Sequence, residues 1–304
     1  MDVKLMSEFI IPISNQHDNI YFIEGERKGR YPYSNSLLIE DYLIDTGISS
    51  RYLRRLKRQF KINKVLLSHW HEDHVSGNRL LKDVEFSCHS KDKHIIEDIE
   101  KMSTYYGLDN TIANDMLDPI IEGFRMENTK ISSPFEGGDT IRTPNYEITV
   151  IHTPGHTAGH CSFYIKNLKL AFLADIDLAK FIYYGCLDSD LIKYEMSIDK
   201  LANLDIEIAI SGHKGIFRGS ELIKKELGEY KSILKKNDER VLSHLPENEI
   251  FNPNDLIRKN IIYKKYSEWK DFEIIGERLM IEKHFEKFLK NGLIEKQDNG
   301  YILK

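Results

Sequence analysis

The chain has 304 residues, 41% of them hydrophobic and 30% charged, with a formal net charge of −5, which is ordinary for a globular protein and argues against tight electrostatic binding of nucleic acid. No apolar run in the sequence is long enough to span a membrane, so we expect no membrane partner. Three cysteines provide no disulfide framework, and the N-terminus lacks the basic start and apolar core of a secretory signal, so we expect a cytoplasmic protein.

The first clear element is an amphipathic helix that starts near Ser49. Leu53, Leu56 and Phe60 recur at helical spacing, and arginines and lysines occupy most positions between them. Because such helices normally turn their charged side toward water, we interpret the basic side as a solvated face rather than a binding patch.

Residues 64–68 form a short aliphatic run that predicts a buried strand, and a helix is predicted to begin shortly after it. The turn between them holds His69, His71, Asp73 and His74. A single histidine is more often a buried polar group with an ordinary hydrogen-bond partner. Three imidazoles and a carboxylate within six positions instead predict a metal site, because these groups are ligands for zinc, iron and manganese.

Residues 91–144 give the weakest pattern. A helix is predicted from His94 to about residue 105 and another over residues 109–125, so a helical insertion is expected over about residues 91–130. The insertion could form one wall of a pocket, and its candidate lining residues are Tyr105, Tyr106, Met116 and Phe124. The alternative, which we favour, is that these side chains pack within the insertion itself.

A second predicted strand, residues 146–151, also ends in a turn that carries imidazoles. Pro154 and Gly155 favour the turn, and His156 follows directly as a candidate metal ligand. His152 and His160 flank it. We expect these two histidines to be outer partners or packing residues, because metal-bound imidazoles need neighbours that orient them.

Two further strands repeat this arrangement. Residues 170–174 end at Asp175 and residues 206–210 lead to His213. Alone, Asp175 could equally be a helix cap or turn residue. Together with the earlier motifs, the pooled donors are five histidines and two aspartates. They exceed the four ligands of one tetrahedral zinc and suit two metal ions that share a carboxylate.

The aromatic run after Asp175 is a candidate wall of the substrate site. Tyr183 and Tyr184 could each offer a hydroxyl to a substrate, and Asp177 could act as a supporting acid close to the metals. The position of this run, a few residues after a predicted strand end, is the reason for the assignment, because ligands gather at such ends in layered α/β folds.

Residues 238–304 are expected to form a small winged-helix-like domain behind a catalytic domain of residues 1–237. Helices are predicted over residues 238–245, 254–263 and 274–289, followed by a hairpin. Residues 215–304 carry 18 basic and 16 acidic side chains. This balance makes nucleic acid a possible but not a favoured partner, and contact with protein, such as a homodimer, is an equal alternative.

The motifs resemble those of the metallo-β-lactamase superfamily over roughly residues 8–215. Asp45, at the end of a predicted strand, matches the first family motif, and the histidine motif is complete. The resemblance implies an α/β fold, a four-layer αββα sandwich, with two divalent metal ions, zinc first and manganese or iron as alternatives. Asp45 would support the site. One metal would be held by His69, His71 and His156, and the other by Asp73, His74 and His213, with Asp175 bridging both.

The resemblance also implies a reaction. A hydroxide that bridges the metals would attack the substrate, and Asp73 and Asp175 would position it as well as the metals. The β-lactam-hydrolysing branch carries a cysteine in place of Asp175 and flavodiiron proteins carry a glutamate in place of His71, so both branches are set aside. The expected activity is hydrolysis of a small ester, thioester or lactone, as in glyoxalase II-like proteins.

Three alternatives stay open. The C-terminal segment resembles that of lactamase-beta-like endoribonucleases, which would make single-stranded RNA the substrate. Iron-dependent sulfur oxygenation, as in persulfide dioxygenases, uses the same ligand types. A metal-binding regulator without activity is the third alternative, and the complete set of ligands argues against it.

Overall fold

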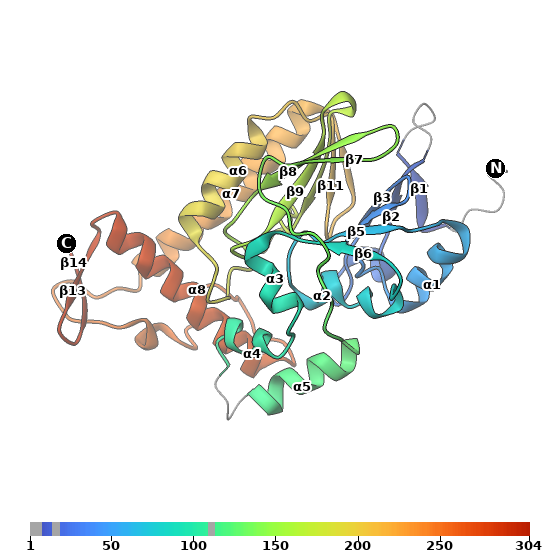
Figure 1. Ribbon diagram of the computed structural model, residues 1–304. Coiled ribbons are helices and arrows are strands. Elements are labelled where there is room, and N and C mark those ends of the chain that lie inside the picture. Colours follow the sequence, from blue (N-terminus) through green and yellow to red (C-terminus); the bar gives the residue numbers. More distant parts are fainter. Residues whose placement is uncertain (1–7, 14–18, 109–112) are drawn as a thin grey trace.

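The computed structural model describes residues 8–13, 19–108 and 113–304, with the backbone alone for residues 113–118. Two sheets of six strands each lie between helices (Figure 1). Within the described residues, no helix combines the length and the apolar character needed to cross a membrane.

The first sheet takes its strands in chain order, from β1 to β6. Its first four strands pair antiparallel, whereas β4, β5 and β6 run parallel. The strands are β1 (Ile10–Pro12), β2 (Ile20–Ile23), β3 (Ser36–Ile39), β4 (Tyr42–Ile44), β5 (Lys64–Leu66) and β6 (Glu85–Ser87).

The second sheet has the order β12-β11-β10-β9-β8-β7. It is antiparallel except for the pair β10 and β11, so both sheets are mixed. The strands are β7 (Thr140–Arg142), β8 (Glu147–His152), β9 (Cys161–Ile165), β10 (Leu170–Ala174), β11 (Ile208–Ser211) and β12 (Ile216–Arg218).

Helices cover the outer faces of both sheets. Those before β7 are α1 (Ser50–Gln59), α2 (Glu72–Val75), α3 (Ser90–Ile96), α4 (Lys101–Tyr105) and α5 (Ala113–Phe124). Those after β10 are α6 (Leu191–Ala202), α7 (Ser220–Leu242) and α8 (Lys270–Lys290). The helical insertion is present as three short helices, α3 to α5, where the sequence predicts two.

Alternate residues of a strand enter different layers, as the pleat requires. In β10, Leu170 and Phe172 belong to the hydrophobic cluster between the sheets, whereas Ala171 and Leu173 belong to the cluster shared with α6 and α7. The outer face of the first sheet shares a third cluster with α1 and α3. Helices, sheet, sheet and helices therefore stack in four layers.

The C-terminal part differs from its prediction. Residues 238–242 complete α7 rather than starting a new helix, because its buried face runs on without interruption from Ile223 to Val241. Only a 3-10 turn, Pro253–Leu256, stands where a helix over 254–263 is predicted. Arg258 and Asn260 have φ values of 65° and 52°, which a helix does not allow. The predictions of separate helices over residues 238–245 and 254–263 are therefore wrong, and the winged helix as a whole stays a prediction.

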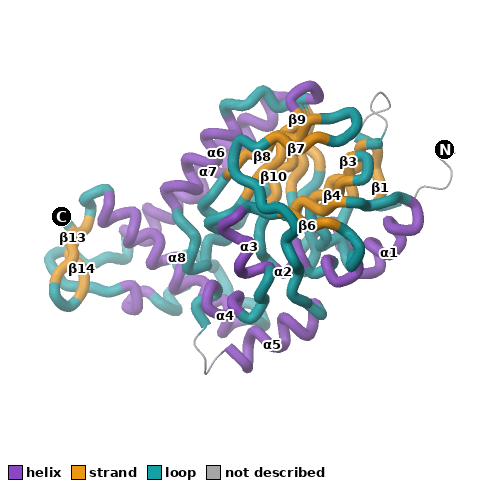
Figure 2. Tube along the Cα trace, in the orientation of Figure 1, coloured by secondary structure: helices purple, strands orange, loops and turns teal. Residues whose placement is uncertain are grey.

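One long helix and one hairpin make up most of this C-terminal part. The hairpin of β13 (Ile294–Gln297) and β14 (Gly300–Leu303) follows α8 and lies at the end of the molecule remote from β1 (Figure 2). The boundary expected between residues 237 and 238 falls inside α7. Residues on both of its sides, such as Leu227 and Phe285, share one hydrophobic cluster. An independent C-terminal domain stays a prediction.

Candidate metal centre

The predicted ligands stand on loops that follow β5, β8, β10 and β11. Because β10 and β11 are parallel neighbours, the loops that carry Asp175 and His213 leave the second sheet at the same edge. The parallel pair β4 and β5 likewise brings Asp45 beside Ser68. The topology therefore gathers loops that lie far apart in the sequence at one place between the sheets.

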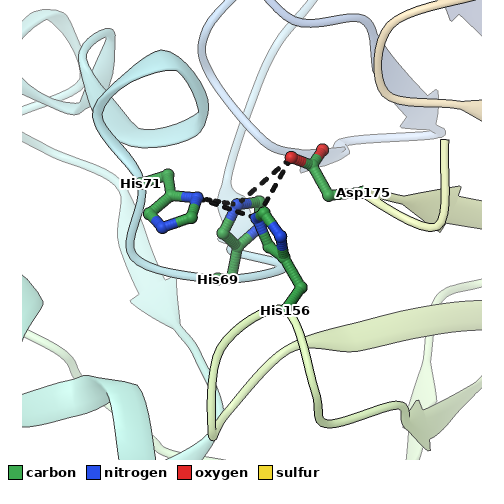
Figure 3. A group of neighbouring side chains, drawn as sticks. All are labelled: His69, His71, His156 and Asp175. Carbon is green, nitrogen blue, oxygen red and sulfur yellow. Dashed lines mark hydrogen bonds and ion pairs between the residues drawn. The ribbon is translucent and has the colours of Figure 1, made fainter. Parts of the chain in front are cut away.

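Four predicted ligands form a first group, shown in Figure 3: His69, His71, His156 and Asp175. Asp175 Oδ2 lies 3.2 Å from His156 Nε2 and 3.8 Å from His69 Nε2. His71 Nδ1 lies 2.8 Å from His156 Nε2. One potential ligand atom from each of the four side chains lies within 4.8 Å of the others.

The other three predicted ligands, Asp73, His74 and His213, form a second group beside it. His213 Nε2 is 3.4 Å from Asp73 Oδ2 and 3.4 Å from His74 Nε2. Asp175 Oδ1 lies 2.9 Å from His74 Nε2 and 3.3 Å from His213 Nε2. The two oxygens of Asp175 thus face different groups, which is the geometry of a bridging carboxylate.

Each of the five imidazoles has its other ring nitrogen engaged away from the centre. His156 Nδ1 donates to the carbonyl of Tyr183 at 2.8 Å, and His213 Nδ1 donates to that of Gly29 at 2.7 Å. The remaining three nitrogens contact neighbouring side chains, in the pairs His69 Nδ1 with Ser68 Oγ, His71 Nε2 with Cys186 Sγ and His74 Nδ1 with Asp45 Oδ2.

Asp45 links both groups from behind. Its carboxylate accepts hydrogen bonds from the backbone N–H of Ser68 at 2.8 Å, from Ser68 Oγ at 2.7 Å and from His74 Nδ1 at 2.8 Å. Ser68 Oγ is in turn 2.9 Å from His69 Nδ1. Asp45 therefore orients His74 directly and His69 through one hydroxyl, as outer partners of metal ligands do.

The donor set fits two divalent cations. With their outer nitrogens engaged, the imidazoles direct the remaining nitrogens at one another and at Asp175. Asp175 Oδ1 is buried and accepts no hydrogen bond in the part of the chain that the structure describes. Burial lowers the pKa values of His69 and His71 well below their usual range, which keeps these rings neutral, and neutral imidazole is the form that binds metal.

A cavity of about 610 Å³ opens onto the centre and exposes His71, Asp73, His156, Asp175 and His213 to it. Parts of the chain that are distant in the sequence contribute to its walls. They include the loop with Arg30 and Tyr31, the insertion with Tyr106 and Ile120, and the C-terminal segment with Tyr263, Ser267, Trp269, Phe272 and Glu273.

The expected outer residues take different places. His160 Nε2 accepts the backbone N–H of Asp175 at 3.1 Å, and burial lowers the pKa of His160 to about 3, so it acts as a neutral acceptor. Asp177 lines the cavity, and burial raises its pKa to about 6. His152 points elsewhere: its Nε2 donates to the carbonyl of Ala158, and its ring stacks on His89 at 4.1 Å.

The two predicted substrate hydroxyls are both engaged within the protein. Tyr183 lines the cavity, but its hydroxyl donates to the carbonyl of Gly185 at 3.1 Å. Tyr184 is fully buried, and its hydroxyl bonds to His284 and Asn237. The prediction that Tyr184 faces a substrate is wrong, because consecutive side chains of this loop point to opposite sides.

Among the candidates from the insertion, Tyr106 does line the cavity. Tyr105 bonds to His94, Phe124 packs near Tyr31 at a ring distance of 6.1 Å, and the side chain of Met116 lies outside the described residues. Packing within the insertion, the favoured alternative, thus describes Tyr105, whereas Phe124 contacts a residue outside the insertion and Tyr106 lines the cavity.

Sequence reasoning missed Glu72, which stands between two ligands on the first turn of α2 and lines the cavity. Its carboxylate accepts hydrogen bonds from the hydroxyls of Tyr31, at 3.0 Å, and Tyr106. Burial, followed by the charge of Asp73, raises the pKa of Glu72 to about 7. The one signal in the sequence was its place inside the histidine motif, where the neighbouring residues are themselves predicted metal ligands.

The fold and the paired donor groups define a two-sheet α/β protein with a candidate dinuclear metal centre. The model of the metallo-beta-lactamase superfamily matches residues 30–213, and the chain belongs to that superfamily.

Relatives and solved structures agree with this family. The chain is 31% identical to a hydroxyacylglutathione hydrolase from Rhizobium etli over 162 residues, 52% of this chain and 50% of that protein. It is 23% identical to a beta-lactamase-like protein 2 homolog from Drosophila melanogaster over 238 residues, 74% of this chain and 71% of that protein. The matched part spans about half the length of the first of these relatives.

A beta-lactamase domain protein from Burkholderia ambifaria has a similar fold along almost the whole chain. The TM-score is 0.75 at 15% sequence identity, and the match covers 99% of this chain and 97% of that one. The similar fold therefore includes the C-terminal part of this chain.

Proposed function

We propose that this chain is a hydrolase that binds two divalent metal ions and cleaves a small ester, thioester or lactone. The position of Asp175 carries the proposal. Its two carboxylate oxygens face two separate groups of imidazoles at 2.9–3.8 Å, and the cavity opens directly onto both groups. Zinc is the first candidate for the metal, with manganese and iron as alternatives, because imidazole and carboxylate accept all three.

Two divalent ions at this place would supply a nucleophile at neutral pH and would hold the negative charge that develops on the substrate oxygen. The residues of the chain do the rest. Asp73 and Asp175 fix the reacting centre at the mouth of the cavity, and Asp45 keeps a proton on His74 Nδ1 so that Nε2 is free. Tyr194 and Tyr230 both donate to the backbone carbonyl of Asp175, at 2.7 and 3.0 Å, and so position the bridging residue.

The similarity to hydroxyacylglutathione hydrolases supports an acyl substrate, because hydroxyacylglutathione is a thioester. The cavity supports it as well. A volume of about 610 Å³ is in the range of small-molecule sites, roughly 300–1,000 Å³. Among the described residues, the cavity is lined by one arginine, Arg30, and one lysine, Lys214. Two cationic side chains are few for a site that binds a polyanion such as RNA.

The first experiment measures metal content and then tests one sample against acyl substrates and labelled single-stranded RNA. The expected result is two ions for each chain, turnover of a thioester or lactone, and intact RNA. His71→Ala should abolish turnover and lower the metal content. His244→Ala, which removes an exposed imidazole from the end of α7, is the matched control and should change neither.

Three outcomes would contradict the proposal. RNA cleavage without acyl turnover would assign the chain to the endoribonuclease alternative. A single iron with consumption of a persulfide would assign it to the sulfur oxygenases. Full activity and full metal content in His71→Ala would remove the proposed centre altogether.

A further inference from the structure

The most exposed aromatic side chains of the described residues gather at a single cavity. Tyr31, Phe181 and Trp269 are 55%, 40% and 54% exposed, and all three line the cavity that opens onto the metal centre. Exposed apolar area of this kind costs free energy unless something covers it. Grouped exposed aromatic residues therefore mark a binding surface rather than chance exposure.

The hydroxyls of four of the five tyrosines that line the cavity are already used within the protein. Tyr31 and Tyr106 donate to Glu72, Tyr183 donates to the carbonyl of Gly185, and Tyr230 donates to that of Asp175. At these four residues a ligand in the cavity therefore meets rings rather than free hydroxyl donors, and the fifth tyrosine, Tyr263, packs its ring on Phe181. The wall recognises apolar surface, although its composition is rich in tyrosine.

This aromatic wall lies on the side of the first group of ligands. The rings of His71 and Tyr106 are 5.7 Å apart, and Tyr106 contacts Phe272 of α8 at 5.2 Å. Phe181 contacts Tyr263 at 4.8 Å. Packed rings thus continue from the metal ligands to the C-terminal segment.

The segment that carries the outer part of the wall is fixed in place. Glu277, fully buried on α8, accepts hydrogen bonds from the backbone N–H groups of Ile262 at 2.7 Å and Tyr263 at 3.1 Å, and from the hydroxyl of Tyr266. A buried carboxylate with several donors holds a loop in one conformation. The wall is therefore formed before a ligand arrives.

The cavity also carries positive charge, beside the second group of ligands. Arg30 and Lys214 are exposed and line the cavity. They flank the hydrogen bond between the carbonyl of Gly29 and His213 Nδ1, so they lie on the side of the second group of ligands. No ion pair joins either side chain to another of the described residues. These two cations are available to an anionic group of a ligand.

We infer that the cavity selects an ester or thioester with an aromatic or similarly large apolar group on one side of the scissile carbonyl and an anionic group on the other. The inference rests on the proposed hydrolase function and goes further by naming the substrate class. The apolar group would cover the wall of Trp269 and Phe272, and the anionic group would approach Arg30 and Lys214. Hydrolysis adds one water across the acyl C–S or C–O bond and releases a carboxylic acid with a thiol or alcohol.

A nucleotide also combines a ring with an anion, but the charges in the cavity favour the acyl compound. Glu72, Asp177 and Glu273 line the cavity together with the two cations. These carboxyl groups oppose a chain of phosphates, whereas a single carboxylate beside Arg30 and Lys214 can avoid them. RNA cleavage is therefore kept as an outcome that would overturn the inference.

The test uses the metal-loaded full chain and four thioesters that differ in one group at a time. Phenylacetyl and acetyl groups are each joined to mercaptopropionate, which is anionic, and to mercaptoethanol, which is neutral. A fifth thioester, formed from succinate and benzyl mercaptan, has the reverse orientation: its anionic group is on the acyl side and its aromatic group on the thiol side. The expected gain in kcat/KM is about tenfold or more for the aromatic group and about two- to fivefold for the anion, whose partners are solvent-exposed.

Two variants assign these gains to the two walls. Trp269→Ala should lower the phenylacetyl-to-acetyl ratio of kcat/KM by about tenfold, and Phe272→Ala provides a second test of the same wall. Lys214→Ala should reduce the preference for mercaptopropionate over mercaptoethanol. The matched controls are Met196→Ala, which removes an apolar side chain that is 63% exposed on α6, and Arg58→Ala, which removes an exposed cation on α1.

The outcomes separate this inference from the proposed function. Turnover of none of the thioesters would overturn the proposed function. Equal kcat/KM for all of them would leave that function in place and overturn the inference. A preference that survives in both Trp269→Ala and Phe272→Ala would also overturn it, as would cleavage of single-stranded RNA in place of the thioesters.

Discussion

Two regions of the molecule meet at the cavity, and they are held in different ways. The metal ligands stand on strand-end loops, and short contacts such as those of Asp45 and Gly29 fix the outer nitrogen of each imidazole. The C-terminal wall, residues 263–273, is attached by ring packing and by the buried Glu277. Because different contacts hold the reacting centre and the wall, a change in one region should leave the other intact.

The largest effect is expected from Asp175→Ala. This change removes the carboxylate whose oxygens face both groups of imidazoles. Turnover should fall by about 10³-fold or more, because the charge stabilisation supplied by both ions depends on it. Metal analysis of the purified variant should give one ion or fewer for each chain.

Asp199→Ala is the control for this change. Asp199 lies on α6 and forms an exposed ion pair with Lys231, so its removal should leave activity and metal content as they are. Two tightly bound ions in Asp175→Ala would show that this carboxylate does not bridge the groups, and the account of the ligand loops would have to be revised.

The next effect tests the C-terminal region. Phe285 on α8 is 2% exposed and packs on Phe251 and Tyr301, at ring distances of 5.7 and 5.2 Å. Phe285→Ala should lower the free energy of unfolding by about 3–5 kcal/mol, as the loss of a buried ring does. Urea denaturation followed by circular dichroism measures it.

Leu289→Ala, at a position of α8 that is 41% exposed, should cost much less and serves as the control. Because residues before and after position 237 share one hydrophobic cluster, a single unfolding transition is expected. A separate early transition in Phe285→Ala would show that the C-terminal part unfolds by itself and would restore the predicted division into two domains.

The difference between the ligand loops and the C-terminal wall also explains what the sequence could predict. Strands β5, β8, β10 and β11 end within about two residues of their predicted ends, because an aliphatic run that stops at a polar or turn-forming residue is a local signal. The parallel pairing of β10 and β11 then brings Asp175 beside His213, and the contact between the two sheets brings Asp175 to His69, which follows β5. Donor types and spacing predicted the seven candidate ligands, because metal ligands are specified by their chemistry, and the family resemblance predicted how they divide into two groups.

The C-terminal part lacks such local signals. Apolar residues at helical spacing fit both one long helix and two short ones, and only packing against α6 and α8 decides that α7 continues past residue 238. The aromatic residues around Trp269 gave no sign of facing a cavity formed by residues far away in the sequence. Tyr184 was misplaced for the same reason, since a loop sequence does not fix which side chain points inward.

A smaller effect is expected behind the metal centre. Asp45→Asn should weaken metal binding by about 10- to 100-fold, the usual cost of losing an outer partner, because an amide cannot accept all the hydrogen bonds from Ser68 and His74. Competition with a chelator measures the affinity. Asp41→Asn, at the other end of β4, is the matched control. Unchanged affinity in Asp45→Asn would mean that the imidazoles orient without this carboxylate.

The smallest effect expected is a loss of stability in acid, through a histidine at the start of the helical insertion. His89 caps α3: its Nδ1 accepts the backbone N–H of Lys91 at 3.2 Å. Burial, followed by the neighbouring His152, lowers the pKa of His89 to about 4, whereas an exposed histidine titrates near 6.5. The neutral ring therefore contributes its full stability above pH 6.5, and the contribution is lost as the pH falls through about 4.

His89→Asn tests this sign, because asparagine is a good cap that does not titrate. In metal-free protein, the free energy of unfolding of the parent should fall more steeply between pH 6.5 and pH 4 than that of the variant. The difference should approach about 1 kcal/mol, the usual contribution of a helix cap. Burial also lowers the pKa of His284 on α8, and Asp238 at 2.7 Å from its Nδ1 opposes that shift. If the free energy of unfolding fell equally steeply with pH in parent and variant, His89 would not be the group that makes the insertion sensitive to acid.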